Sequence, residues 1–297
     1  MLKVTTIILI WTLAVNVSIS QEVTQFQGIP RIGIIADCQY ADQATQGVRH
    51  YRLSVQKLNE CVDSLNKFEL DHVFHLGDFI DQHHESFDEV LPIFDRLKAP
   101  HTQVLGNHDF SVDEQFKEAV PEMMGLKARY FSMMIKEWKF IILDGNDVSL
   151  YAWPKLSENY KQALRIYEQE YADRETWNGA IGKSQMSWLN AELEQAEIDG
   201  DKVILLCHFP VLPEDSHILW NAGELVDLVS SYSCVKAWFN GHNHAGGYAE
   251  YQGIHFVTFQ GMVDTDQNSY ATVVLGSNKL IIKGFGREQD RELELRP

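Results

Sequence analysis

The first half of the chain alternates short apolar runs with segments whose apolar residues recur at helical spacing. Residues 48–65 and 87–97 place apolar side chains every three or four positions, which predicts two amphipathic helices. Three apolar runs flank these helices, at 31–36, 72–76 and 101–105, and we expect each to be a strand. Because helices join successive strands in a β-α-β-α-β order, the three strands are predicted to be parallel.

The second half is predicted to be richer in strands. We expect a hairpin at 130–143 and an amphipathic helix at 184–195 with Ser184 as its N-cap. Between them, residues 148–180 are irregular and aromatic, with a helical piece near 157–171, and such an insertion often shapes a substrate pocket. Five further apolar runs predict strands at 202–207, 235–239, 254–259, 270–275 and 280–283. We find no linker between these elements and no internal repeat, so we expect one α/β domain.

The composition is that of a folded, acidic protein. Of the 297 residues, 45% are hydrophobic and 23% are charged, which argues against disorder. The formal net charge of −17 disfavours nucleic acid or an anionic membrane surface as a partner. A phosphate-bearing substrate would need local positive charge, which bound divalent metals would supply.

Residues 1–20 have the pattern of a signal peptide, which leaves 21–297 as the folded domain. Lys3 gives the positive start, 4–17 is mostly apolar, and the small residues Ser18 and Ser20 precede a cleavage site. The alternative is a membrane anchor, but the apolar run is short for a span and is interrupted by polar residues. We therefore expect export to the periplasm or the cell exterior, with no stable membrane span after cleavage.

The cysteines show no disulfide framework. The chain contains four of them: Cys38, Cys61, Cys207 and Cys234. Their spacing favours small buried thiols, with a single Cys207–Cys234 bridge as the alternative.

Polar residues of the kinds that bind metals follow five of the predicted strands. These residues are Asp37 and Gln39, Asp78, Asn107 and His108, His208, and His242 with His244. A lone Asp-x-Gln or His-x-His has no diagnostic value, and an isolated His208 would be read as a core histidine. Five such clusters at strand ends in one domain indicate a dinuclear metal site instead, because open α/β sheets place ligand sites at the carboxyl ends of their strands. Asp78 is the natural bridging carboxylate, since two cations roughly 3.5–4 Å apart need a shared anionic ligand.

The order Asp-x-Gln, Gly-Asp-x-x-Asp, Gly-Asn-His-Asp, His and Gly-His-x-His resembles the calcineurin-like metallophosphoesterase superfamily. Position 39 is Gln where the general pattern has His, and this points to the manganese-dependent ADP-ribose/CDP-alcohol diphosphatase branch. Further similarity lies in Asp37-Cys38-Gln39-Tyr40-Ala41-Asp42, Trp177-Asn178-Gly179-Ala180 and Gly241-His242-Asn243-His244-Ala245-Gly246-Gly247-Tyr248. The resemblance implies an α/β fold in which a two-sheet β-sandwich is flanked by helices. An N-terminal export signal is not expected of the branch in animals.

The resemblance also implies the site residues and cofactors. One ion would be held by Asp37, Gln39, Asp78 and His244, and the other by Asp78, Asn107, His208 and His242. This set of oxygen and imidazole ligands suits Mn²⁺, with Mg²⁺, Fe and Zn²⁺ as alternatives. The two metal ions would generate a hydroxide from a bridging water, and this hydroxide would attack phosphorus. His108 would protonate the leaving oxygen or stabilise the developing charge, with Asp78 or Asp109 as its orienter.

The implied substrate is a small nucleotide, a nucleoside diphosphate linked to another group, such as ADP-ribose or CDP-choline. Arg49 and Arg52 are candidate phosphate-binding residues, although both would also suit a solvated helix face. Tyr248 is a candidate for stacking on the base. The alternatives are a broader phosphomonoesterase or cyclic nucleotide phosphodiesterase and, from another class, a binding scaffold without catalysis.

Overall fold

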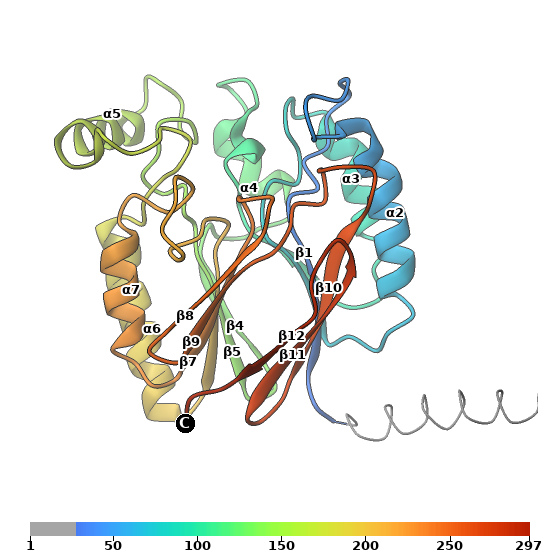
Figure 1. Cartoon of the computed structure of the whole chain (residues 1–297). Helices are drawn as coiled ribbons and strands as arrows, with labels where there is room; N and C mark the ends of the chain where they lie inside the picture. The colour runs from blue at the N-terminus through green and yellow to red at the C-terminus, as the bar shows by residue number, and fades with distance from the viewer. Residues whose placement is uncertain (1–27) are drawn as a thin grey trace, which may run out of the picture.

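Two six-stranded sheets pack face to face, with helices on both outer faces (Figure 1). The computed structural model describes residues 28–297, so the predicted signal peptide at 1–20 lies outside the described residues. The first sheet contains β1 (Arg31–Ile35), β2 (His72–His75), β3 (His101–Gln103), β10 (Ser269–Leu275), β11 (Lys279–Gly286) and β12 (Arg291–Glu294). The second contains β4 (Phe131–Ile135), β5 (Trp138–Ile142), β6 (Lys202–Leu206), β7 (Val235–Asn240), β8 (Gly247–Tyr251) and β9 (Ile254–Thr258).

In the part of the chain that the structure describes, six α-helices and four shorter helical turns connect the strands. The α-helices are α2 (Ser54–Leu65), α3 (Ser86–Phe94), α4 (Val120–Met123), α5 (Glu158–Ile166), α6 (Lys183–Asp199) and α7 (Ala222–Ser230). The turns are η1 (Tyr51–Leu53), η2 (His108–Phe110), η3 (Lys117–Ala119) and the π-helical η4 (Tyr167–Tyr171). Within residues 28–297, no helix combines the length and apolar character that crossing a bilayer requires.

The strand orders are β12-β11-β10-β1-β2-β3 and β4-β5-β6-β7-β9-β8. The predicted parallel arrangement is confirmed, because β1 pairs with β2 and β2 with β3 in parallel. In the second sheet β5, β6, β7 and β9 are also parallel neighbours. The carboxyl ends of the central strands therefore lie together at one edge of each sheet.

The core has three layers of apolar contact. Between the sheets, Phe74 of β2 stacks on Phe140 of β5 with ring centroids 4.9 Å apart. On the outer face of the first sheet, α2 and α3 bury residues such as Leu58 and Phe94. On the outer face of the second, α6 and α7 bury residues such as Leu189. This arrangement confirms the expected helix-flanked sandwich.

One local expectation needs correction, and two others are confirmed. The N-cap of α6 is Gly182, which offers no side chain, so Ser184 lies inside the helix and is not its cap. The helical piece expected near 157–171 is confirmed, as α5 up to Ile166 followed by the π-helical turn η4. All four cysteines are buried free thiols, as the favoured expectation had it, and the alternative Cys207–Cys234 bridge is absent from the described structure.

Candidate metal centre

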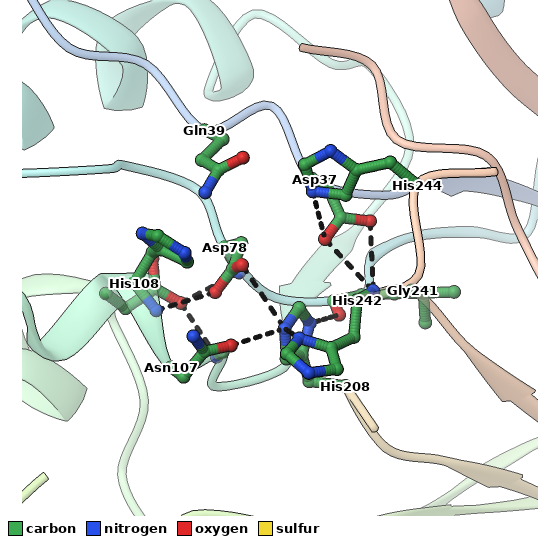
Figure 2. Close-up of polar contacts among 12 residues, drawn as sticks. Asp37, Gln39, Asp78, Asn107, His108, His208, Gly241, His242 and His244 are labelled. Atoms are coloured by element: carbon green, nitrogen blue, oxygen red, sulfur yellow. Dashed lines mark hydrogen bonds and ion pairs between the residues drawn. The ribbon is translucent and has the colours of Figure 1, made fainter. Parts of the chain in front are cut away.

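The metal-type side chains converge at one end of the sandwich, in the loops after β1, β2, β3, β6 and β7 (Figure 2). They come from both sheets, and most are almost completely buried: Asp37, Gln39, Asp78, Asn107, His208, His242 and His244 are each at most 9% exposed. The loops after β1 and β2 are joined by main-chain hydrogen bonds, from Gln39 N to Asp78 O at 2.8 Å and from Asp37 N to Gly77 O at 3.2 Å. The fold thus brings five separate stretches of sequence to one point.

Asp78, His208 and His242 form the first ligand set, which we call the His208 group; their ligand atoms lie within 4.8 Å of one another. Nδ1 of His208 donates to the Leu76 main-chain oxygen at 2.8 Å, so Nε2 carries the lone pair of the neutral ring. That Nε2 is 3.0 Å from Oδ1 of Asn107, 3.1 Å from Nδ1 of His242 and 3.3 Å from Oδ2 of Asp78. Four electron-pair donors therefore face one another, the arrangement that a bound cation requires.

Asp37, Asp78 and His244 form the second set, which we call the Asp37 group; their ligand atoms also lie within 4.8 Å of one another. Gln39 lies beside it, and its Nε2 donates to Oδ1 of Asp81 at 3.0 Å. This bond fixes the amide so that Oε1 is left buried without a hydrogen-bond partner. Buried acceptors are rarely left unsatisfied, and an oxygen-binding cation would satisfy this one. The residues present therefore fit a two-cation centre that shares Asp78.

The centre attracts positive charge. Burial would lower the pKa of His208, but the Asp78 and Asp37 carboxylates raise it to about 9. Burial would raise the pKa of Asp78, but His208 and His108 hold it well below its usual range. Burial raises the pKa of Asp37 more than His244 lowers it. Divalent cations would supply the positive charge that protonated imidazoles otherwise provide.

The backbone at the centre is strained in a way that the sequence pattern did not indicate. Asp37, Gln39, Asp78 and His242 all have positive φ, at 49°, 46°, 55° and 68°. Asp37 and Gln39 therefore do not lie on one side of an extended chain, as alternate residues of a strand would, because each occupies the left-handed region. Such conformations are costly for residues with a side chain and cluster at functional sites.

Gly241 allows close approach to Asp37, and this gives a test of the packing. A Cβ at position 241 would lie 2.5 Å from Oδ2 of Asp37. We expect Gly241→Ala to displace that carboxylate and weaken metal binding by at least about 10–100-fold, the usual effect of disturbing a ligand's support. Isothermal titration with Mn²⁺ measures this effect. Gly223→Ala is the matched control, because nothing lies within 4 Å of its added Cβ, and it should bind metal as the wild type does.

His108 is oriented by Asp81. Nδ1 of His108 lies 2.7 Å from Oδ1 of Asp81, the same oxygen that accepts from Gln39. The sequence had suggested Asp78 or Asp109 for this role. Asp78 instead accepts the main-chain N–H of His108 at 2.8 Å, and Asp109 accepts main-chain N–H groups, including that of Gly106 at 2.8 Å. Burial would lower the pKa of His108, but Asp78 and Asp81 together shift it upward.

Two further residues orient the histidines and were not identified from the sequence. Oδ1 of Asn178 lies 2.8 Å from Nε2 of His242, which turns Nδ1 toward His208. Oδ1 of Asp264 lies 2.9 Å from Nδ1 of His244, which turns Nε2 toward Asp37. Such outer partners fix the tautomer of metal-binding histidines. Asn178 belongs to the aromatic insertion, but neither residue has a local pattern that marks its role.

The three candidate substrate residues lie at different places. Arg49 is half-buried. Burial would lower its pKa, but the Tyr51 side chain and the charges of Asp78 and Asp81 raise it. Arg52 is exposed and pairs with Asp42. The Tyr248 hydroxyl lies 3.0 Å from Nδ1 of His255, on the β8–β9 hairpin. Arg49 forms a backbone bridge with Asp264 beside the centre, whereas Arg52 and Tyr248 have other partners.

Known proteins resemble this chain over most of its length. The family model for calcineurin-like phosphoesterases matches residues 30–246. The manganese-dependent ADP-ribose/CDP-alcohol diphosphatase of Homo sapiens is 29% identical, covering 87% of this chain and 91% of its own. The Arabidopsis thaliana protein of that name is 27% identical, with 88% and 96% covered. A dimetal phosphatase structure from Danio rerio has a TM-score of 0.82 at 23% identity, covering 90% of this chain and 99% of its own.

Proposed function

The chain belongs to the calcineurin-like phosphoesterase family and is a metallophosphoesterase, and from this premise we propose that it hydrolyses the diphosphate bond of nucleoside diphosphates linked to another group. ADP-ribose and CDP-alcohols are the proposed substrates, and the products are a nucleoside monophosphate and a phosphorylated remainder. The observation that carries the proposal is the pair of ligand groups sharing Asp78, with Gln39 beside one of them. The names of the relatives that match nearly the whole chain support the substrate class.

In this proposal the Asp37 group and Gln39 hold one divalent ion, and the His208 group and Asn107 hold the other. Mn²⁺ is the proposed metal, because the ligands are oxygens and imidazoles without a thiolate. When bound, two such metal ions polarise phosphoryl oxygens and lower the pKa of a water molecule. Asp78 would share its negative charge between the two ions, and its Oδ1 also accepts the main-chain N–H of His108 at 2.8 Å, which fixes the position of one residue relative to the other.

His108 is the proposed proton donor. Its Nδ1 is engaged by Asp81, which leaves Nε2 to hold a proton for the leaving oxygen. A phosphate leaving group needs less help than an alkoxide, so this step matters more for monoesters with poor leaving groups. Arg49 is the proposed contact for the second phosphate, because its backbone bridges to Asp264 beside the Asp37 group.

A substrate panel tests the function. The metal-stripped protein is supplied with Mn²⁺ or Mg²⁺ and incubated with ADP-ribose, CDP-choline, a phosphomonoester and a cyclic nucleotide. We expect Mn²⁺-dependent release of AMP and ribose 5-phosphate from ADP-ribose, and of CMP and phosphocholine from CDP-choline. Faster release of inorganic phosphate from the monoester, or faster opening of the cyclic nucleotide, would favour the alternative phosphoesterases. Metal binding without turnover of any substrate would favour a scaffold.

Gln39 gives a test of metal preference. Gln39→His replaces a hard amide oxygen by a nitrogen donor that favours Zn²⁺ and Fe over Mn²⁺. We therefore expect competition dialysis against equal Mn²⁺ and Zn²⁺ to shift the bound metal toward Zn²⁺. Gln43→His is the matched control, because Gln43 also donates to Asp81, at 2.8 Å, but is less buried than Gln39. Unchanged preference in Gln39→His would remove Gln39 from the ligand set.

A further inference from the structure

Lys57 is a buried lysine whose ammonium bonds only to main chain in the described structure. Its side chain extends from α2 and is 2% exposed. Nζ donates to the main-chain oxygens of Met262 at 2.7 Å, Asp264 at 3.0 Å and Thr265 at 2.6 Å. Burial lowers the pKa of Lys57 to about 8. A buried ammonium is unfavourable unless its protons are bonded, so these three oxygens must stay turned toward it.

The segment that Lys57 holds, residues 262–265, we call the Asp264 loop. Its main chain supports the loop after β1, with Met262 N donating to Ala36 O and Val263 N donating to Asp37 O, both at 2.9 Å. Its one acidic side chain, Asp264, lies 2.9 Å from Nδ1 of His244. The Asp264 loop therefore contacts both Asp37 and His244, two of the three members of the Asp37 group.

The contact between Asp264 and His244 determines which imidazole nitrogen faces the Asp37 group. The carboxylate of Asp264 accepts a hydrogen bond from Nδ1 of His244 at 2.9 Å. This hydrogen bond keeps the proton of the neutral imidazole on Nδ1, and Nε2 of His244 then faces Asp37 at 3.6 Å from Oδ1. A shift of the Asp264 loop would turn the ring and remove this preference.

We infer that Lys57 is a positioning residue for the metal centre: its ammonium fixes the Asp264 loop, and through Asp264 it fixes the tautomer and direction of His244. The inference rests on the proposed two-ion centre and adds to it a residue that touches no ligand. Lys57 acts directly on the Asp37 group, because the Asp264 loop bonds to Asp37 and His244, whereas the imidazoles of His208 and His242 bond to other partners.

Metal titration of Lys57→Met tests the inference. Methionine keeps the length of the side chain but cannot donate, so the three oxygens lose their partner. For the stripped protein titrated with Mn²⁺, we expect one of the two ions to bind about 10–100-fold more weakly and the other to be unchanged. Calorimetry gives the affinities, and electron paramagnetic resonance of free Mn²⁺ counts the bound ions. Two ions bound with wild-type affinities would overturn the inference.

Lys236→Met is the matched control. Lys236 is also buried, on β7, and its Nζ donates to three main-chain oxygens, those of Ser233, Arg296 and Pro297. These bonds lie at the opposite end of β7 from His242. We expect Lys236→Met to lower the thermal unfolding temperature and to bind both ions as the wild type does. Equal loss of one ion in both lysine variants would overturn a specific role for Lys57.

Asp264→Ala tests the relay even if Lys57→Met fails to fold, because all three Lys57 bonds go to main chain and remain available. We expect Asp264→Ala to show the same selective loss of one ion. The double variant with Lys57→Met should bind that ion no more weakly than the weaker-binding single variant, because the effects of substitutions within one relay do not add. Wild-type binding by Asp264→Ala, or additive losses in the double variant, would overturn the inference. If the wild-type protein does not bind two metal ions, the proposed function itself is refuted. That result is distinct from the outcomes for the Lys57 and Asp264 variants.

Discussion

Replacing Asp78 by asparagine is expected to release both divalent ions and to lower hydrolysis of ADP-ribose by at least about 10³-fold. The carboxylate belongs to both ligand groups and is 1% exposed, so its charge has no substitute from solvent. Metal ions lower the free energy of the transition state by several kcal/mol, because they stabilise the charge that develops there. Each 1.36 kcal/mol corresponds to about a tenfold change in rate. Metal content per chain and turnover with added Mn²⁺ are the two measurements.

Asp71→Asn is the control for this prediction. Asp71 precedes β2, whereas Asp78 follows it, and Asp71 bonds to the Arg31 main chain and to Lys136. That variant should keep both ions and wild-type turnover. Two ions retained by Asp78→Asn would show that the carboxylate does not bridge them.

Replacing His108 by alanine is expected to leave both ions bound and to lower turnover by about 10²–10⁴-fold, the usual worth of a general acid. His108 is half-buried and its imidazole bonds to Asp81, whose other partners are Gln39 and Gln43. The loss should be smaller for ADP-ribose than for an alkyl phosphomonoester, because the diphosphate already has a good leaving group. Steady-state rates on both substrates, with metal content measured in parallel, give the comparison.

His101→Ala controls for the loss of an imidazole. His101 begins β3, whose carboxyl end leads to His108, and it pairs with Asp95 on the helix side. It should keep wild-type turnover on both substrates. Loss of an ion in His108→Ala would instead make His108 a ligand and contradict its assignment as the proton donor.

The central strands and the place of the site could be predicted from the sequence. Runs such as 31–36 and 202–207 are apolar throughout because β1 and β6 are covered on both faces, by the other sheet and by helices. Their alternation with amphipathic segments determined the parallel order, and parallel strands bring their carboxyl ends together. The polar residues that follow them therefore met, as expected, at one end of the sandwich.

The edges of the sheets and the supports of the site could not be predicted in this way. β8 and β12 are partly exposed edge strands of five and four residues, too short and polar to show a period. Asn178 and Asp264 meet their histidines across 64 and 20 residues of sequence, and no local pattern encodes such a contact. The left-handed backbone of Asp37 and Gln39 arises from main-chain bonds to the loop after β2, so it exists only in the folded chain.

The measurement that tests the two-ion centre most directly is anomalous scattering from crystals soaked in Mn²⁺. We expect two peaks roughly 3.5–4 Å apart, with Asp78 between them, Oε1 of Gln39 directed at the ion of the Asp37 group, and Asn107 at the ion of the His208 group. A single peak, or two peaks that Asp78 does not join, would contradict the account.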